Sequence, residues 1–281
     1  MKHCIIMTAY KDVGLINKII ESAPDNFDFY IHLDKKCQIT PSDISPRANV
    51  FKKYKIFWGS IEHLKAFLFL LSKAYGANRQ YDFYHLITGQ DYICCPLSRI
   101  DDLLKLHTSY LDCFDLPQSH WWMGGLHILQ YRTLASFDDV RKPYYMKVLD
   151  KSYQFFQQMF HLTRKLPSYK LYGGSVYCSL SEQAVKYCLE SELAKDMIAR
   201  LNNSTCGEEV FFQTVLMNSP LRDTIVTSNL RYIDWSVPNG PKVLVTEDVS
   251  NVIKSHNLFC RKVDCRLSKD FLVSMNEYIN Q

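Results

Sequence analysis

Short β-rich runs alternate with helical patterns in the first 90 residues of the chain. This alternation is typical of α/β proteins with a largely parallel sheet, because parallel strands need a crossover connection that is usually a helix. The helical patterns cover residues 13–22 and 61–74. The predicted strands are residues 3–8, 27–33, 50–54 and 83–88. We therefore predict an α/β fold with a mostly parallel central sheet flanked by helices.

The second half of the chain is less regular. Residues 109–168 are rich in aromatic side chains and contain a helix-like pattern at 140–166. Beyond them the sequence predicts a strand at 171–180, a long helix at 181–201, an acidic helix from about Glu208 and a last helical stretch from Thr246. No internal repeat, low-complexity tract or linker interrupts the pattern, so we predict one catalytic domain, 1–281.

Composition and charge narrow the classes of function. The formal net charge of the 281 residues is +4, which is too small and too dispersed to indicate a nucleic-acid partner. Ten cysteines without a secretory signal peptide favour reduced thiols in the cytoplasm. The longest apolar run, residues 64–71, is far shorter than the roughly 20 residues that cross a bilayer. We expect no transmembrane segment and a cytoplasmic protein, either free or associated peripherally with the inner face of the membrane.

Two adjacent carboxylates, Glu208 and Glu209, stand at the start of an apolar helical pattern. They follow Gly173 and Gly174, whose backbone can approach a ligand closely or form a bulge. Carboxylates in a first helical turn also complement the helix dipole, which contributes roughly 0.3–1 kcal/mol without any function. Residue type alone leaves both interpretations open, but four further motifs along the chain favour a sugar-transfer site.

These motifs resemble the Branch family of glycosyltransferases (GT14), which contains the core-2 and I-branching β-1,6-N-acetylglucosaminyltransferases and the peptide O-xylosyltransferases. The resemblance implies a GT-A-like glycosyltransferase fold with a nucleotide-binding half, 1–108, and an acceptor and catalytic half, 109–281. The segments that carry it, in the order of the family, are residues 30–36, 84–92, 173–177, 208–212 and 258–264.

The resemblance also assigns a catalytic base and a diphosphate site. The base of the family corresponds to Glu209, and its diphosphate-binding lysine corresponds to Lys262. Lys242 is the nearest candidate for a second basic residue upstream, and Arg261 adds positive charge beside Lys262.

The donor is expected to lie against the ends of predicted strands. Asp34 falls where the family meets the nucleoside, and Gly89, Gln90 and Asp91 fall where it meets the donor sugar in place of a metal-binding DxD motif, which is not evident in this sequence. We therefore expect no metal and no other cofactor, because fixed cationic side chains can neutralise the leaving diphosphate. A metal-dependent transferase that uses Asp91 as a lone ligand is the alternative.

Four residues are candidates for contact with a glycan acceptor. Ser175 and Tyr177 follow the two glycines, Glu208 adjoins the predicted base, and Trp235 follows a short β-like run. Each has a structural alternative: a bulge for the first two, a helix cap for Glu208 and ordinary packing for Trp235.

The predicted reaction is an inverting, metal-independent transfer of a sugar from a UDP-sugar to a carbohydrate hydroxyl in cell-surface polysaccharide synthesis. Glu209 would act as general base, and we expect buried neighbours such as Phe211 and Phe212 to raise its basicity against the helix dipole. N-acetylglucosamine is the first choice of donor sugar. The alternatives are a UDP-xylose-dependent O-xylosyltransferase and a non-catalytic carbohydrate-binding protein on the same fold.

Overall fold

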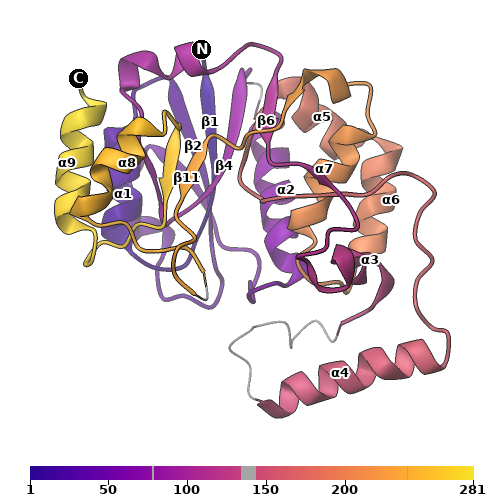
Figure 1. The fold of residues 1–281 in the computed structure, drawn as a ribbon. Helices are drawn as coiled ribbons and strands as arrows, with labels where there is room; N and C mark the ends of the chain where they lie inside the picture. Colours follow the sequence, from indigo (N-terminus) through magenta and orange to yellow (C-terminus); the bar gives the residue numbers. More distant parts are fainter. Residues whose placement is uncertain (78, 134–143, 239) are drawn as a thin grey trace.

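The computed structural model describes residues 1–77, 79–133, 144–238 and 240–281. Its largest element is a seven-stranded sheet with the strand order β10-β6-β9-β4-β1-β2-β3 (Figure 1). Strand β1 pairs in parallel with both β2 and β4, β2 pairs in parallel with β3, and only β9 runs antiparallel to its neighbours. The strands are β1 (His3–Ala9), β2 (Phe27–Leu33), β3 (Ala48–Phe51), β4 (Phe83–Thr88), β6 (Ser109–Leu111), β9 (Cys178–Ser181) and β10 (Ile225–Val226).

Two smaller sheets accompany the main one. The first joins β11 (Arg231–Ile233), β12 (Phe259–Arg261) and β5 (Asp91–Ile93), and the second pairs β7 (Phe114–Asp115) with β8 (Tyr172–Gly173). The α-helices of the described residues are α1 (Val13–Ser22), α2 (Ile61–Tyr75), α3 (His127–Gln130), α4 (Tyr144–Met159), α5 (Glu182–Glu190), α6 (Glu192–Leu201), α7 (Glu208–Met217), α8 (Val249–Lys254) and α9 (Lys269–Ile279).

Each face of the main sheet carries its own apolar core. Every residue of β1 is buried, and alternate side chains enter opposite cores, as the pleat of a strand requires. Ile5 and Met7 pack in the core that α1 and α9 cover, whereas Cys4 and Ile6 pack in the core that α2, α5, α6 and α7 cover. Figure 1 shows these two groups of helices on either side of the sheet. The predicted α/β architecture is confirmed.

Two predicted elements of the second half are wrong. The predicted strand 171–180 is divided into β8 and β9, because at Gly174 the backbone leaves the sheet and donates to Glu209 O at 2.9 Å. The predicted helix 181–201 is two helices, which meet at Ser191 in an extended conformation (φ −69°, ψ 149°). The Ser191 side chain accepts a hydrogen bond from Ala194 N, so it caps the second helix.

Other boundaries shift for local reasons. The third strand ends at Phe51 rather than residue 54, because the N–H groups of Lys53 and Tyr54 donate to His32 Nε2 instead of continuing a ladder. The predicted helix 140–166 is observed as α4, which ends before His161 with its left-handed φ of 54°. Residues 140–143 of that prediction lie outside the described residues, and Thr246 opens a 3-10 turn (Thr246–Asp248) ahead of α8.

The helices of the described residues were also compared with the requirements of a bilayer. None of them combines the length and the apolar character that a membrane crossing demands.

Candidate active site

The carboxyl ends of β1, β2 and β4 lie at one edge of the sheet, because these strands are parallel neighbours. Asp34 N donates to Ala9 O at 2.8 Å, and Gly89 N donates to Thr8 O at 2.9 Å. A Cβ at position 89 would lie 3.0 Å from Ala9 Cβ, so glycine permits this close approach. Val263 N donates to Gln90 O at 2.9 Å and brings the end of β12 to the same place. Predicted donor-binding segments from distant parts of the sequence therefore meet.

Asp34 is held by the loop that surrounds it. Its Oδ1 accepts from Lys36 N at 2.9 Å and Ile56 N at 3.3 Å, and its Oδ2 lies 3.6 Å from Lys36 Nζ. The side chain is nearly buried. Asp34 thus stands at the predicted edge and fixes the shape of that loop with one carboxylate.

Asp91 and Arg261 form a buried ion pair beside Tyr177. Asp91 Oδ1 lies 3.3 Å from Arg261 Nη1, and Asp91 Oδ2 accepts from the backbone N and hydroxyl of Thr88. The guanidinium carbon of Arg261 lies 3.9 Å from the centre of the Tyr177 ring. Burial acts to lower the pKa of Arg261, but Asp91 and Tyr177 outweigh it, so the pKa is raised and the cation persists. Both oxygens of Asp91 are engaged.

Gln90 has a buried amide nitrogen, Nε2, with no hydrogen-bond partner among the described residues. A buried donor without a partner is destabilising unless another group satisfies it. Gln90 is therefore available to a ligand at the edge of the sheet.

Lys262 lies in an electropositive environment. Burial lowers the pKa of this half-buried lysine, and the charges of Lys11 and Arg261 lower it further. Lys11 Nζ itself lies 3.0 Å from Asp264 and 3.4 Å from Asp12. Sequence reasoning missed Lys11, although its position directly after a buried strand was a usable signal. Lys11 and Arg261 are each paired with carboxylates, so among these three cations of the described structure Lys262 is the one left for an incoming anion to neutralise.

The Lys242 ammonium, predicted to bind the diphosphate, is paired with carboxylates of the protein. Its ammonium lies 2.6 Å from Asp248 Oδ1 and 4.0 Å from Asp234 Oδ2, so carboxylates already neutralise it. Its backbone oxygen accepts a hydrogen bond from Lys262 N at 3.3 Å. Lys242 thus lies beside the backbone of Lys262 and points its charge at Asp248.

Glu209 begins helix α7 together with Glu208. Burial, and to a smaller extent the neighbouring charge of Glu208, together raise the pKa of Glu209 to about 8. Within the described parts of the chain, no donor is bonded to the Glu209 carboxyl. The direction of the pKa shift agrees with the expected gain in basicity, and Phe211 and Phe212 are fully buried in the apolar core.

Glu208 is bound by a histidine that sequence reasoning missed. His63 Nδ1 lies 3.0 Å from Glu208 Oε1, and His63 Nε2 lies 3.1 Å from Thr8 Oγ1. Glu208 Oε2 is buried and has no partner among the residues that the structure describes. One oxygen is thus held in place while the other can accept from a ligand. A polar residue on the apolar face of 61–74 was the only available sign of His63.

The glycine segment shapes the other side of the site. A Cβ at Gly174 would lie 2.1 Å from Asp112 O, so the close approach is to the protein's own backbone. Gln213 Nε2 donates to Ser175 O, and Ser175 Oγ accepts from Tyr177 N at 3.3 Å. Burial raises the pKa of Tyr177, Arg261 acts to lower it, and the charges of Asp91, Glu209 and Glu208 add to the increase. Tyr177 therefore connects the Asp91–Arg261 pair with the acidic end of α7.

Trp235 follows β11 on the loop that also holds Asp234 and Lys242. Its side chain is 66% exposed, so ordinary core packing does not explain it. Because this aromatic face is open to solvent, it is available to stack on a sugar.

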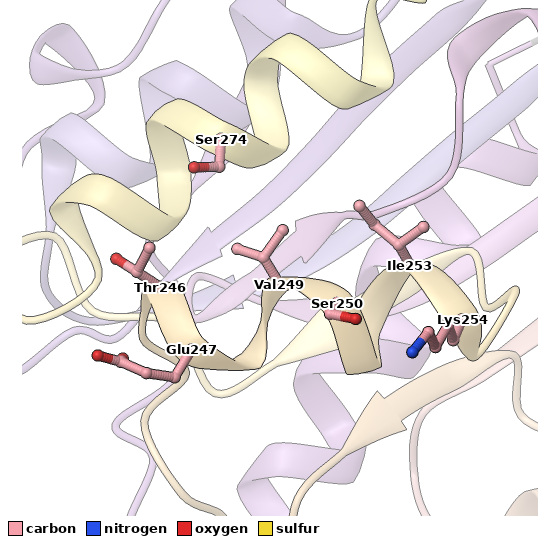
Figure 2. Close-up of a pocket in the computed structure, with 7 residues that line it drawn as sticks. All are labelled: Thr246, Glu247, Val249, Ser250, Ile253, Lys254 and Ser274. Carbon is pink, nitrogen blue, oxygen red and sulfur yellow. The ribbon is translucent and has the colours of Figure 1, made fainter.

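Among the described residues, one group could hold a metal ion: Asp12, Asp264 and Cys265. The Lys11 ammonium already lies against both of its carboxylates. A separate hollow of about 490 Å³ lies between α8 and α9, with Thr246, Val249, Ile253 and Ser274 among its lining residues (Figure 2). None of the predicted site residues lines it.

Comparison with known proteins identifies the family of the chain. Beta-glucuronosyltransferase GlcAT14A from Arabidopsis thaliana is 32% identical over 105 residues, which are 35% of this chain and 24% of that protein. Xylosyltransferase 1 from Canis lupus familiaris is 26% identical over 231 residues, which are 78% of this chain and 22% of that protein. The chain thus spans less than a quarter of either relative's length.

Solved structures give weaker similarities. Mouse xyloside xylosyltransferase 1 matches over 95% of this chain and 98% of that chain, with 9% identity and a TM-score of 0.38, a similarity that supports no further conclusion. The sequence profile of the Core-2/I-Branching enzyme family, by contrast, matches residues 5–256. The chain belongs to the Core-2/I-Branching (Branch) family of glycosyltransferases.

Proposed function

We propose that this protein transfers a sugar from a UDP-sugar to a carbohydrate hydroxyl, with Glu209 as general base. The observation that carries the proposal is the acidic start of α7, where the pKa of Glu209 is raised to about 8 and its carboxyl faces no donor in the described structure. A base whose pKa lies near the working pH combines a useful ionised fraction with the strength to accept a proton.

The proposed chemistry is a single displacement with inversion. Glu209 removes the proton from the acceptor hydroxyl while that oxygen attacks the anomeric carbon, and the UDP leaves from the opposite face. The buried Oε2 of Glu208 supports this role, because it can accept a hydrogen bond from a second acceptor hydroxyl. His63 holds the other oxygen of Glu208 in place.

The leaving diphosphate is proposed to bind Lys262 and the neighbouring cations without a metal. Burial and the nearby charges of Lys11 and Arg261 lower the pKa of Lys262 more than Asp264 raises it, and this supports the assignment, since an anion would relieve that repulsion. Asp91 is less suited to hold a metal as a lone ligand, because Thr88 and Arg261 already engage both of its oxygens.

Two arguments bear on the donor sugar, and they favour different sugars. N-acetylglucosamine remains the first proposal, with a cell-surface polysaccharide as acceptor. Xylose is the second, because the relative that aligns with 78% of this chain is named xylosyltransferase 1. Glucuronic acid enters the comparison through the name of the relative with 32% identity.

The test is a donor screen with UDP-N-acetylglucosamine, UDP-xylose and UDP-glucuronic acid against oligosaccharide acceptors, in EDTA and with Mn²⁺. We expect Glu209→Gln to lower kcat with the active donor by about 10²- to 10⁴-fold, because general-base catalysis contributes that much. Unchanged turnover in Glu209→Gln would rule out this base.

Binding of UDP separates an enzyme from a carbohydrate-binding protein. Excess UDP should raise the midpoint of thermal unfolding equally in EDTA and in Mn²⁺, for the native chain and for Glu209→Gln alike. Lys262→Met should abolish the shift, whereas Lys254→Met, an exposed lysine on α8, should retain it. The absence of a UDP shift, together with binding of oligosaccharides, would favour the non-catalytic alternative.

A further inference from the structure

Helix α4 stands apart from the two helical layers that cover the sheet (Figure 1). Only Asp150 and Gln157 are buried along its length. The Gln157 side chain bonds both ways with the backbone of Arg132: Nε2 donates to Arg132 O at 2.8 Å, and Oε1 accepts from Arg132 N at 2.9 Å. These hydrogen bonds fix one face of α4 toward the rest of the chain, so the opposite face points away from it.

That opposite face is apolar and exposed. With 100° between successive residues, its large side chains all lie within about 60° of Ser152. An apolar stripe of this kind normally faces a protein core, yet between 43% and 65% of each side chain is accessible. Its residues are Tyr145, Val148, Leu149, Phe155, Phe156 and Met159.

The charges around the stripe are mostly positive. Between residues 144 and 170 the chain carries a single acidic residue, Asp150, and that residue is buried on the other face. Lys151 lies about 100° from the centre of the stripe, at its border, and Lys147 lies about 140° from the centre, further round on the same side of the helix. Beyond α4, Lys170 Nζ lies 2.6 Å from Asp115 Oδ2 and Arg164 donates to the backbone oxygens of Arg200 and Asn202, so the positive charge on α4 itself comes from Lys147 and Lys151.

We propose that α4 binds the surface of a bilayer that contains anionic phospholipids, with its axis in the plane of the membrane. A helix with a strongly apolar face, aromatic side chains on that face and lysines at its border is suited to this position, where rings and aliphatic chains enter the headgroup boundary. Anionic headgroups neutralise the bordering lysines. A second copy of the chain would instead bring two like-charged borders together.

This inference concerns where the protein acts, and it does not depend on the proposed chemistry. It makes α4 the element responsible for the expected peripheral membrane association. A transferase held in this way would meet acceptors that are themselves attached to or growing at a membrane.

The test is cosedimentation of the full chain with vesicles of phosphatidylcholine alone and of phosphatidylcholine mixed with phosphatidylglycerol. We expect binding to the mixed vesicles, weaker binding at high salt and little binding to phosphatidylcholine alone. Phe155→Ser combined with Phe156→Ser should weaken binding by at least about 10-fold, because two apolar side chains no longer enter the bilayer.

The matched control is Val273→Ser on α9, which also removes an exposed apolar side chain and should leave binding unchanged. The thermal midpoint verifies that each variant is folded. Equal binding by the double phenylalanine variant would overturn the proposal. A dimer that light scattering detects without vesicles, and that the same variant abolishes, would show that a second copy covers α4 instead.

Discussion

Glu209 carries a pKa of about 8, so its protonation changes within the range of ordinary assays. A general base acts when ionised, and below pH 8 the ionised fraction falls about 10-fold for each pH unit. We expect kcat/KM to rise with pH and to level off above about 8. Glu208→Gln should move this rise to lower pH, because it removes the charge that adds to the effect of burial. A profile that is flat from pH 6 to 9 would contradict the assignment.

His63 is a positioning residue for Glu208 rather than a catalytic group. His63→Ala should lower kcat about 10-fold, as expected for the loss of one hydrogen bond to a charged group. His63→Asn should restore much of the activity, since the Asn amide can donate from near the position of Nδ1. Thr8→Val, which leaves the contact with Glu208 intact, should have a smaller effect. Equal losses in all three variants would indicate a general structural defect.

The site residues differ in how far the sequence could predict them. Glu209 and Lys262 belong to local motifs, and their roles as base and diphosphate ligand stay predictions. Lys242 was only the nearest basic residue upstream, and its ion pair with Asp248 depends on a turn whose geometry no local pattern contained. His63 and Lys11 belong to no motif and acquire significance only through contacts made across the fold.

The break between α5 and α6 offers a test of a single helix cap. Ser191→Ala should lower the free energy of unfolding by about 1 kcal/mol, because Ala194 N loses its acceptor. Ser191→Asp should retain most of the stability, and turnover should be unaffected in both variants. Urea denaturation measures the difference. No change in Ser191→Ala would show that the end of α5 alone sets the break.

The helices and strands whose own sequence carries a clear pattern were predicted correctly. Strands β1, β2 and β4 are runs in which apolar residues predominate, and α1 and α2 carry regular apolar faces. The region after residue 170 was harder, because the turn at Gly174 depends on a contact with Asp112 and the serine at 191 is compatible with a helix interior as well as a cap.

Arg231 connects the smaller three-stranded sheet to the main one. It is 5% exposed, and its guanidinium donates to Ser179 Oγ, Leu86 O and Cys178 O. Burial lowers its pKa to about 10, so it remains charged at neutral pH. Its hydrogen bonds therefore join β11 to both β4 and β9.

Arg231→Met should destabilise the whole molecule by about 3–5 kcal/mol, because four buried acceptors, Asn229 O among them, lose their donor. Denaturant unfolding measures this loss. Arg79→Met, which removes an exposed pair with Asp28, should have little effect. Similar small effects in both variants would show that the two sheets hold together without Arg231.

The strand order affects the chain while the ribosome is still translating it. The neighbours of β4 in the finished sheet are β1 and β9, and Ser179 of β9 is 94 positions further along the chain than its partner His85. Until the ribosome has released β9, β4 is an apolar edge strand with unpaired backbone groups, a template on which neighbouring chains can aggregate. Strand β4 is therefore the central strand of the completed sheet but an exposed edge strand while the chain is still being synthesised.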